Sequence, residues 1–149
     1  MVWWVKMNDE HPRYFTLEEA NATLPYVRSI VTDVVEAYAE WRDRVALYEV
    51  KAANSRSEDG ESAEQVDLRQ EVERIAKRIG GYLSELEAVG CVFKGFDDGL
   101  IDFLSKQDGK DIYLCWKLGE QEITHWHDLD AGYAGRQPLA REYASGETR

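Results

Sequence analysis

The fold is decided by residues 24–48, which read LPYVRSIVTDVVEAYAEWRDRVALY. Apolar side chains recur here at steps of three and four residues, the spacing of one face of an α-helix. The seam consists of Leu24, Val27, Val31, Val34, Tyr38, Trp41, Val45 and Tyr48. Such a heptad-like seam predicts a long amphipathic helix that packs against a second helix, as in a coiled coil. Trp41 lies in this seam, so we expect its side chain to be substantially buried.

A helix start signal precedes the seam. Residues 16–19 read TLEE, in which Thr16 and Glu19 have the spacing of a capping box. Pro25 has no backbone N–H and constrains the residue before it. We therefore expect a short first helical segment and then a longer helix that begins near Thr23 and runs to about Ala53.

A second helix is predicted over residues 62–90. Ser62 and Gln65 form another capping box, and Gly90 suits the position just after a helix end. The polar residues 54–61 indicate a hairpin tip, which we expect to be mobile. Gly80-Gly81 is either a tolerated weak spot or a place where a neighbour approaches closely. The second seam consists of Leu68, Val72, Ile75, Ile79, Tyr82, Leu86 and Val89.

After Gly90 the apolar pattern changes from helical to alternating, which is typical of β-strands. Asp108-Gly109 is a hairpin turn signal between two of the runs. Strands are expected at residues 91–93, 100–104, 111–118 and 122–127. The predicted fold is therefore α+β, with a long antiparallel helical hairpin followed by a small antiparallel β-meander.

The predicted hairpin and meander make one domain over residues 14–139. The hairpin is expected over residues 16–90, and the meander with a terminal loop over residues 91–139. Residues 1–13 and 140–149 are expected to be flexible termini. Translation could start at Met1 or at Met7, and the sequence does not distinguish the two.

Composition disfavours some partners. The chain has 149 residues and a formal net charge of -11, so nucleic acid and anionic membrane surfaces would be repelled. No apolar run approaches the roughly 20 residues that a membrane-spanning helix needs. Cys91 and Cys115 have no metal-like spacing and are expected to be buried apolar residues. We expect a cytoplasmic location.

Four parts of the sequence resemble a bacterial family of uncharacterised proteins, the Domain of Unknown Function 2203 family. The resemblance covers most of the chain from Tyr14 to Leu139, and it implies a helical hairpin with a small β element. It implies no activity. In the family motif His127 has a counterpart, whereas His125 does not. The matching stretches are Tyr14–Asn21 with Leu24-Pro25, Gly99–Phe103, Tyr113–Glu120 and Trp126–Leu139.

The loop over residues 126–137 is the candidate ligand site. His127, Asp128, Asp130 and Arg136 are expected to converge on one partly exposed pocket, because burying such groups unpaired is costly. In this pocket Arg136 would pair with one of the aspartates, and His127 would be oriented by a carboxylate or carbonyl oxygen. A small anionic ligand could bind there, or the same residues could only brace the fold.

A divalent metal is the second possibility for this region. On a strand, His125 and His127 would point to the same side, and Glu122 could complete a set of metal ligands. The alternative is that His127 only donates to a nearby oxygen and holds the loop. No cofactor follows from the residues alone.

Two functions therefore remain as hypotheses. The first is a non-enzymatic interaction protein whose hairpin self-associates into a homodimer, since the helices would expose a second apolar surface around Ile30, Val35 and Leu47. The second is a small-ligand or metal-binding protein, which could be an enzyme, with its site in the 126–137 loop.

Overall fold

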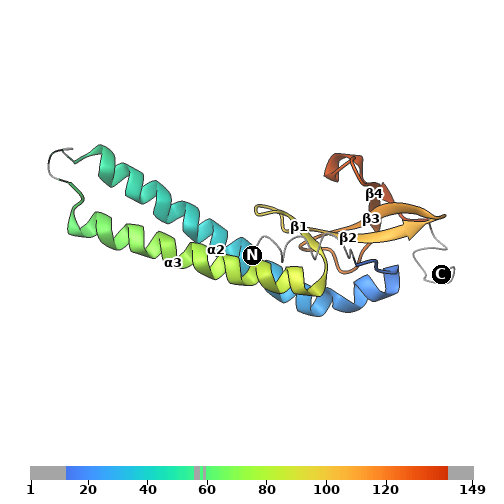
Figure 1. Cartoon of the computed structure of the whole chain (residues 1–149). Coiled ribbons are helices and arrows are strands. Elements are labelled where there is room, and N and C mark those ends of the chain that lie inside the picture. Colours follow the sequence, from blue (N-terminus) through green and yellow to red (C-terminus); the bar gives the residue numbers. More distant parts are fainter. Residues whose placement is uncertain (1–12, 56–57, 59, 141–149) are drawn as a thin grey trace, which may run out of the picture.

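The computed structural model describes residues 13–55, 58 and 60–140. Over these residues the chain forms two long helices followed by a five-stranded antiparallel sheet, which confirms the predicted α+β fold (Figure 1). We predicted flexible termini and a mobile hairpin tip. Nearly all of the terminal residues, and some residues of the tip, lie outside the described residues.

Helix α2 (Leu17–Ala53) begins at the predicted capping box. The hydroxyl of Thr16 accepts a hydrogen bond from the backbone N–H of Glu19, and the Glu19 carboxylate accepts one from the backbone N–H of Thr16. The predicted interruption at Pro25 is wrong, because α2 continues through this residue. Leu24 and Val27 on either side of Pro25 are buried in one core, so packing outweighs the one backbone hydrogen bond that proline removes.

Helix α3 (Ala63–Val89) has both of its predicted ends. Ser62 and Gln65 form the capping box, and Gly90 has a φ of 105°, a left-handed conformation that glycine adopts without strain. A Cβ atom added at Gly80 or Gly81 would meet no described atom within 4 Å. Within the described residues, no neighbouring element therefore packs closely against these two glycines.

The sheet has the order β1-β2-β3-β4-β5, so each strand pairs with the one that follows it in the chain. Asp108 and Gly109 both have positive φ angles, 54° and 79°, which fits the predicted hairpin turn between β2 and β3. The fifth strand was not predicted from the sequence. The strands are β1 (Val92–Gly95), β2 (Leu100–Gln107), β3 (Lys110–Lys117), β4 (His125–Asp128) and β5 (Gln137–Pro138).

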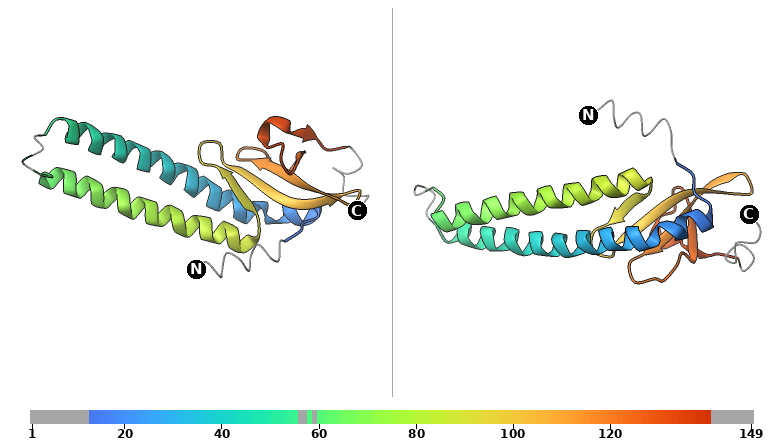
Figure 2. Two further views of the ribbon diagram at one scale, coloured as in Figure 1. Left: turned by 45° about the horizontal axis from the view of Figure 1, so that its top comes forward. Right: turned by 90° about the horizontal axis from the view of Figure 1, so that it is seen from below.

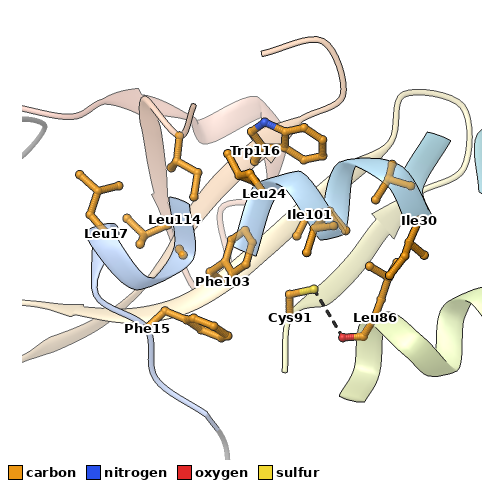
Figure 3. Close-up of a cluster of buried hydrophobic side chains, with 14 of the residues drawn as sticks. Phe15, Leu17, Leu24, Ile30, Leu86, Cys91, Ile101, Phe103, Leu114 and Trp116 are labelled. Carbon is orange, nitrogen blue, oxygen red and sulfur yellow. Dashed lines mark hydrogen bonds between the residues drawn. The ribbon is translucent and has the colours of Figure 1, made fainter. Parts of the chain in front are cut away.

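The main core lies between the sheet and the first half of α2, as Figure 3 shows. We call the sheet face that packs against α2 the inner face and the opposite one the outer face. Phe15, which precedes α2, packs edge to face on Phe103 with 5.1 Å between ring centroids. The inner face contributes Ile101, Phe103, Ile112, Leu114 and Trp116, and α2 contributes Leu17, Ala20, Leu24, Val27, Ile30, Val31 and Val34.

The ends of α2 and α3 that are joined by the hairpin tip extend past the edge of the sheet (Figures 1 and 2). Tyr38 makes the last stacking contact with this end of the sheet, with its ring 4.7 Å from that of Phe96. We call residues 38–53 and 63–79 the arm. Trp41 lies in the arm and is only half-buried, because two helices cannot surround a side chain as large as tryptophan.

The sheet covers more of α2 than the sequence indicated. Ile30 is buried and Val35 packs against the core, so these residues do not form the exposed apolar surface that was predicted. Leu47 is exposed, as expected. Among the described residues, neither α2 nor α3 has a stretch apolar enough and long enough to span a bilayer.

Candidate functional site

The outer face of the sheet carries a buried polar cluster. Asp102 lies between Ile101 and Phe103 on β2, so its side chain points away from the core. Cys115 on β3 pairs directly with Asp102, and His127 lies on the next strand, β4. Asp102, Cys115 and His127 are only 3%, 1% and 1% exposed. The sheet therefore places a carboxylate, a thiol and an imidazole side by side, out of contact with water.

His127 is held by both of its ring nitrogens. Nδ1 lies 2.7 Å from the backbone oxygen of Asp128, and Nε2 lies 3.1 and 3.2 Å from the two carboxylate oxygens of Asp102. A carbonyl oxygen can only accept, so Nδ1 carries a hydrogen and donates it. The prediction that a carbonyl or a carboxylate orients His127 agrees with these contacts, and both are present.

Lys94 and Tyr113 form the side of the cluster nearest to solvent. The Nζ atom of Lys94 lies 3.6 Å from an oxygen of Asp102, although the lysine side chain is 43% exposed. The same ammonium lies 5.2 Å from the ring centroid of Tyr113, whose ring is 5.6 Å from that of His127. Lys94 therefore supplies positive charge to a carboxylate that is otherwise buried.

Cys115 is a neutral thiol in this environment. Burial raises the pKa of Cys115 to about 12, and the nearby Asp102 carboxylate contributes in the same direction. A thiol with so high a pKa is a poor nucleophile at neutral pH. Chemistry that needs a free Cys115 thiolate is therefore disfavoured unless another positive charge stabilises that thiolate.

The terminal loop is fastened to the sheet by Arg136. Its Nη2 atom donates to both carboxylate oxygens of Glu120, at 2.9 and 3.0 Å, and lies 3.4 Å from the backbone oxygen of Cys115. Its guanidinium also lies over the Tyr133 ring, 4.9 Å from the centroid. The expected pairing of Arg136 with an aspartate is wrong, because Glu120 in the β3–β4 connection lies closer. This ion pair offsets the charge that would attract an anionic ligand.

The four residues predicted to form one pocket have separate partners. His127 faces Asp102, whereas Asp128, the next residue on the strand, points to the opposite face and lies 3.0 Å from Lys110. Asp130 is exposed, and Arg136 binds Glu120. The alternation of side chains along β4 explains why neighbours in the sequence separate in space.

The predicted metal ligands separate in a similar way. His125 contacts the Thr124 hydroxyl at 2.9 Å, and the exposed Glu122 lines an open hollow with Arg28 and Gln121. In the part of the chain that the structure describes, one group of three potential metal ligands has its ligand atoms within 4.8 Å of one another, and it consists of Asp102, Cys115 and His127. Sequence reasoning missed Asp102 and Cys115 in this role. The available signal was the charged Asp102 between the apolar residues Ile101 and Phe103.

Replacing Arg136 with alanine should lower the free energy of unfolding by about 1–3 kcal/mol, because a partly buried Glu120 carboxylate would lose its partner. Urea denaturation would measure this. The matched control is Arg42→Ala, since the Arg42–Asp97 pair is exposed and should contribute little. An equal effect of the two substitutions would show that Arg136 does not brace the loop.

The fold and the outer-face cluster define an α+β protein in which a helical hairpin carries an antiparallel meander with a buried Asp-Cys-His group. Residues 13–139 match the model of a family described as "Uncharacterized conserved protein (DUF2203)", and the chain belongs to this family. The comparisons with curated proteins and with solved structures gave no match.

Proposed function

We propose that this protein is a non-enzymatic interaction protein that self-associates through its arm, so that two arms in a homodimer form a four-helix bundle. The observation that supports this most directly is the state of the arm's apolar side chains. Leu47 and Val50 are 43% and 55% exposed, although both lie on a helix that is long enough to pack against further helices. These two residues are three positions apart, so they lie on the same side of α2.

The seam between the two helices also supports a larger assembly. Trp41, Val45, Tyr48 and Val72 occupy seam positions, yet each is only half-buried. Two helices cover a seam from one side, whereas a four-helix bundle encloses it. A second copy of the arm would therefore remove from water the apolar side chains that α2 and α3 leave partly exposed.

Charge on the arm permits this association. Residues 38–53 contain three basic and three acidic residues, and residues 63–79 contain four of each, so the arm has no net charge in a chain of net charge -11. Within the arm, Arg44–Glu71 and Arg78–Glu40 pair across the two helices at 3.0 and 3.1 Å. These pairs hold the hairpin in shape before association, which reduces the entropy that binding would cost.

Light scattering should report twice the 17.2 kDa chain mass at high micromolar concentration. Leu47→Glu should weaken the dimer at least about tenfold, since burying a leucine stabilises by roughly 1.5–3 kcal/mol. Leu129→Glu is the matched control, because Leu129 is exposed to a similar degree, 48%, but lies outside the arm. A wild-type protein that stays monomeric throughout, or equal effects of the two substitutions, would reject the arm as the interface.

The two cysteines support a reducing compartment as the place where the protein works. Cys91 and Cys115 are both free and buried, and burial raises the pKa of Cys91 to about 11. Free thiols of this kind are common in the cytoplasm, where glutathione and thioredoxin keep them reduced. We propose a cytoplasmic location on this basis.

A further inference from the structure

The contact between His127 and Asp102 lacks a hydrogen-bond donor when the His127 ring is neutral. His127 uses its Nδ1 hydrogen on the backbone oxygen of Asp128, so a neutral ring presents only a lone pair at Nε2. That lone pair faces two carboxylate oxygens at 3.1 and 3.2 Å, and carboxylate oxygens are also acceptors. Both groups are buried, so water cannot separate them. A cation between them, either a proton or a metal ion, must satisfy the contact.

We infer that a divalent metal ion of the zinc class binds between Asp102, Cys115 and His127. Carboxylate oxygen, thiolate sulfur and imidazole nitrogen are the atoms that ligate zinc in proteins. One ligand comes from each of the neighbouring strands β2, β3 and β4, and the three ligand atoms lie within 4.8 Å of one another. The sulfur of Cys115 distinguishes this set from a magnesium or calcium site, since those ions prefer oxygen ligands alone.

The spacing of the ligand atoms fits such an ion after a small adjustment. Tetrahedral bonds of about 2.0–2.3 Å place neighbouring ligand atoms about 3.3–3.6 Å apart. The Nε2 atom of His127 and the nearest Asp102 oxygen are 3.1 Å apart, a few tenths of an ångström closer than this spacing. The Cys115 sulfur lies within 4.8 Å of both atoms, so its side chain has to approach them when the ion binds. The hydrogen bond from Nδ1 to the Asp128 carbonyl is the outer-shell contact that aims Nε2 of a ligating histidine at its metal.

Charge balance favours the same ion. A divalent cation with one thiolate, one carboxylate and one neutral imidazole has no net charge, which lowers the cost of burying the group. Lys94 opposes metal binding, because its ammonium lies 3.6 Å from the Asp102 carboxylate and repels a second cation there. Lys94→Met should therefore bind the metal more tightly than the wild type.

Cobalt(II) titration of the EDTA-treated full chain is the experiment, because a thiolate bound to cobalt gives a charge-transfer absorption band in the near ultraviolet. We expect one cobalt per chain and a band that zinc abolishes by displacement. Cys115→Ser should remove the band. Asp102→Asn should weaken binding by more than the roughly 10- to 100-fold that loss of an outer-shell partner costs.

Two matched controls are available in the chain. Cys91→Ser removes the other buried thiol, which donates to the Leu86 carbonyl, and it should leave the band unchanged. His125→Gln removes the neighbouring histidine on β4 and should also leave binding unchanged, which separates this site from one built on Glu122, His125 and His127. Circular dichroism would confirm that each variant is folded.

Several results would overturn the inference. A wild-type chain that shows no stoichiometric cobalt binding and no band has no such site, and the cation between Asp102 and His127 is then a proton. Loss of the band in Cys91→Ser, or loss of binding in His125→Gln with binding retained in Asp102→Asn, would place the metal elsewhere. If Cys115→Ser fails to fold, the wild type still decides the question: zinc should raise its melting temperature relative to EDTA, and an unchanged temperature rejects the site.

Discussion

Replacing Trp116 with alanine should lower the free energy of unfolding by about 3–5 kcal/mol, the range for large aromatic side chains in a core. Trp116 is 0% exposed and lies where the inner face of the sheet meets α2. Its indole N–H donates to the backbone oxygen of Glu120 at 2.9 Å, so the substitution also frees a carbonyl in the β3–β4 connection. Urea denaturation would measure the change, and thermal unfolding should shift by on the order of 10 °C.

Trp41→Ala is the control for Trp116→Ala. Trp41 is half-buried in the arm and stacks on Tyr38 with 5.8 Å between ring centroids, so less apolar area is exposed to water when it is removed. We expect a clearly smaller loss of stability for Trp41→Ala. If Trp41→Ala destabilised the protein as much as Trp116→Ala, the main core would not lie between the sheet and α2.

Replacing His127 with alanine should lower the free energy of unfolding by about 3–5 kcal/mol, because it leaves the buried Asp102 carboxylate without its main partner. Lys94 is 3.6 Å from that carboxylate and should hold the loss toward the lower end of this range. The measurement needs EDTA in the buffer, so that metal binding does not add to the stability of the wild type.

A double-mutant cycle tests the origin of this loss. Asp102→Ala alone removes the buried carboxylate, and the double variant with His127→Ala removes both groups. Because an unpaired buried charge is the costly element, the double variant should be less destabilised than the sum of the single variants. Additive losses would show that His127 stabilises the fold only by filling space against Tyr113.

Local signals in the sequence were sufficient to predict both helices and most of the sheet. The capping boxes at Thr16 and Ser62 and the helix end at Gly90 depend on residues within one helical turn. Pro25 misled the prediction, because its local cost is set against the burial of Leu24 and Val27 on a sheet that lies far away in the sequence. β5 escaped prediction for a related reason, since two residues have no usable periodicity.

The candidate site was predictable only in part. His127 was among the residues selected from the sequence, and the structure gives both of its ring nitrogens a partner. The partner itself, Asp102, lies 25 positions earlier in the chain and becomes adjacent only through the pairing of β2, β3 and β4. The predicted grouping of His127 with Asp128 failed because consecutive residues of a strand face opposite ways.

The α+β class, the two helices with their ends, and the turn at Asp108-Gly109 could be predicted without a structure, since each follows from interactions among residues close together in the chain. Three features result from long-range packing: α2 continues through Pro25, Arg136 pairs with Glu120, and Asp102, Cys115 and His127 form one buried group. These features depend on strand register and on the packing of the sheet against α2. A shift of one residue in that register would turn every side chain of a strand to the other face, so no local pattern specifies them.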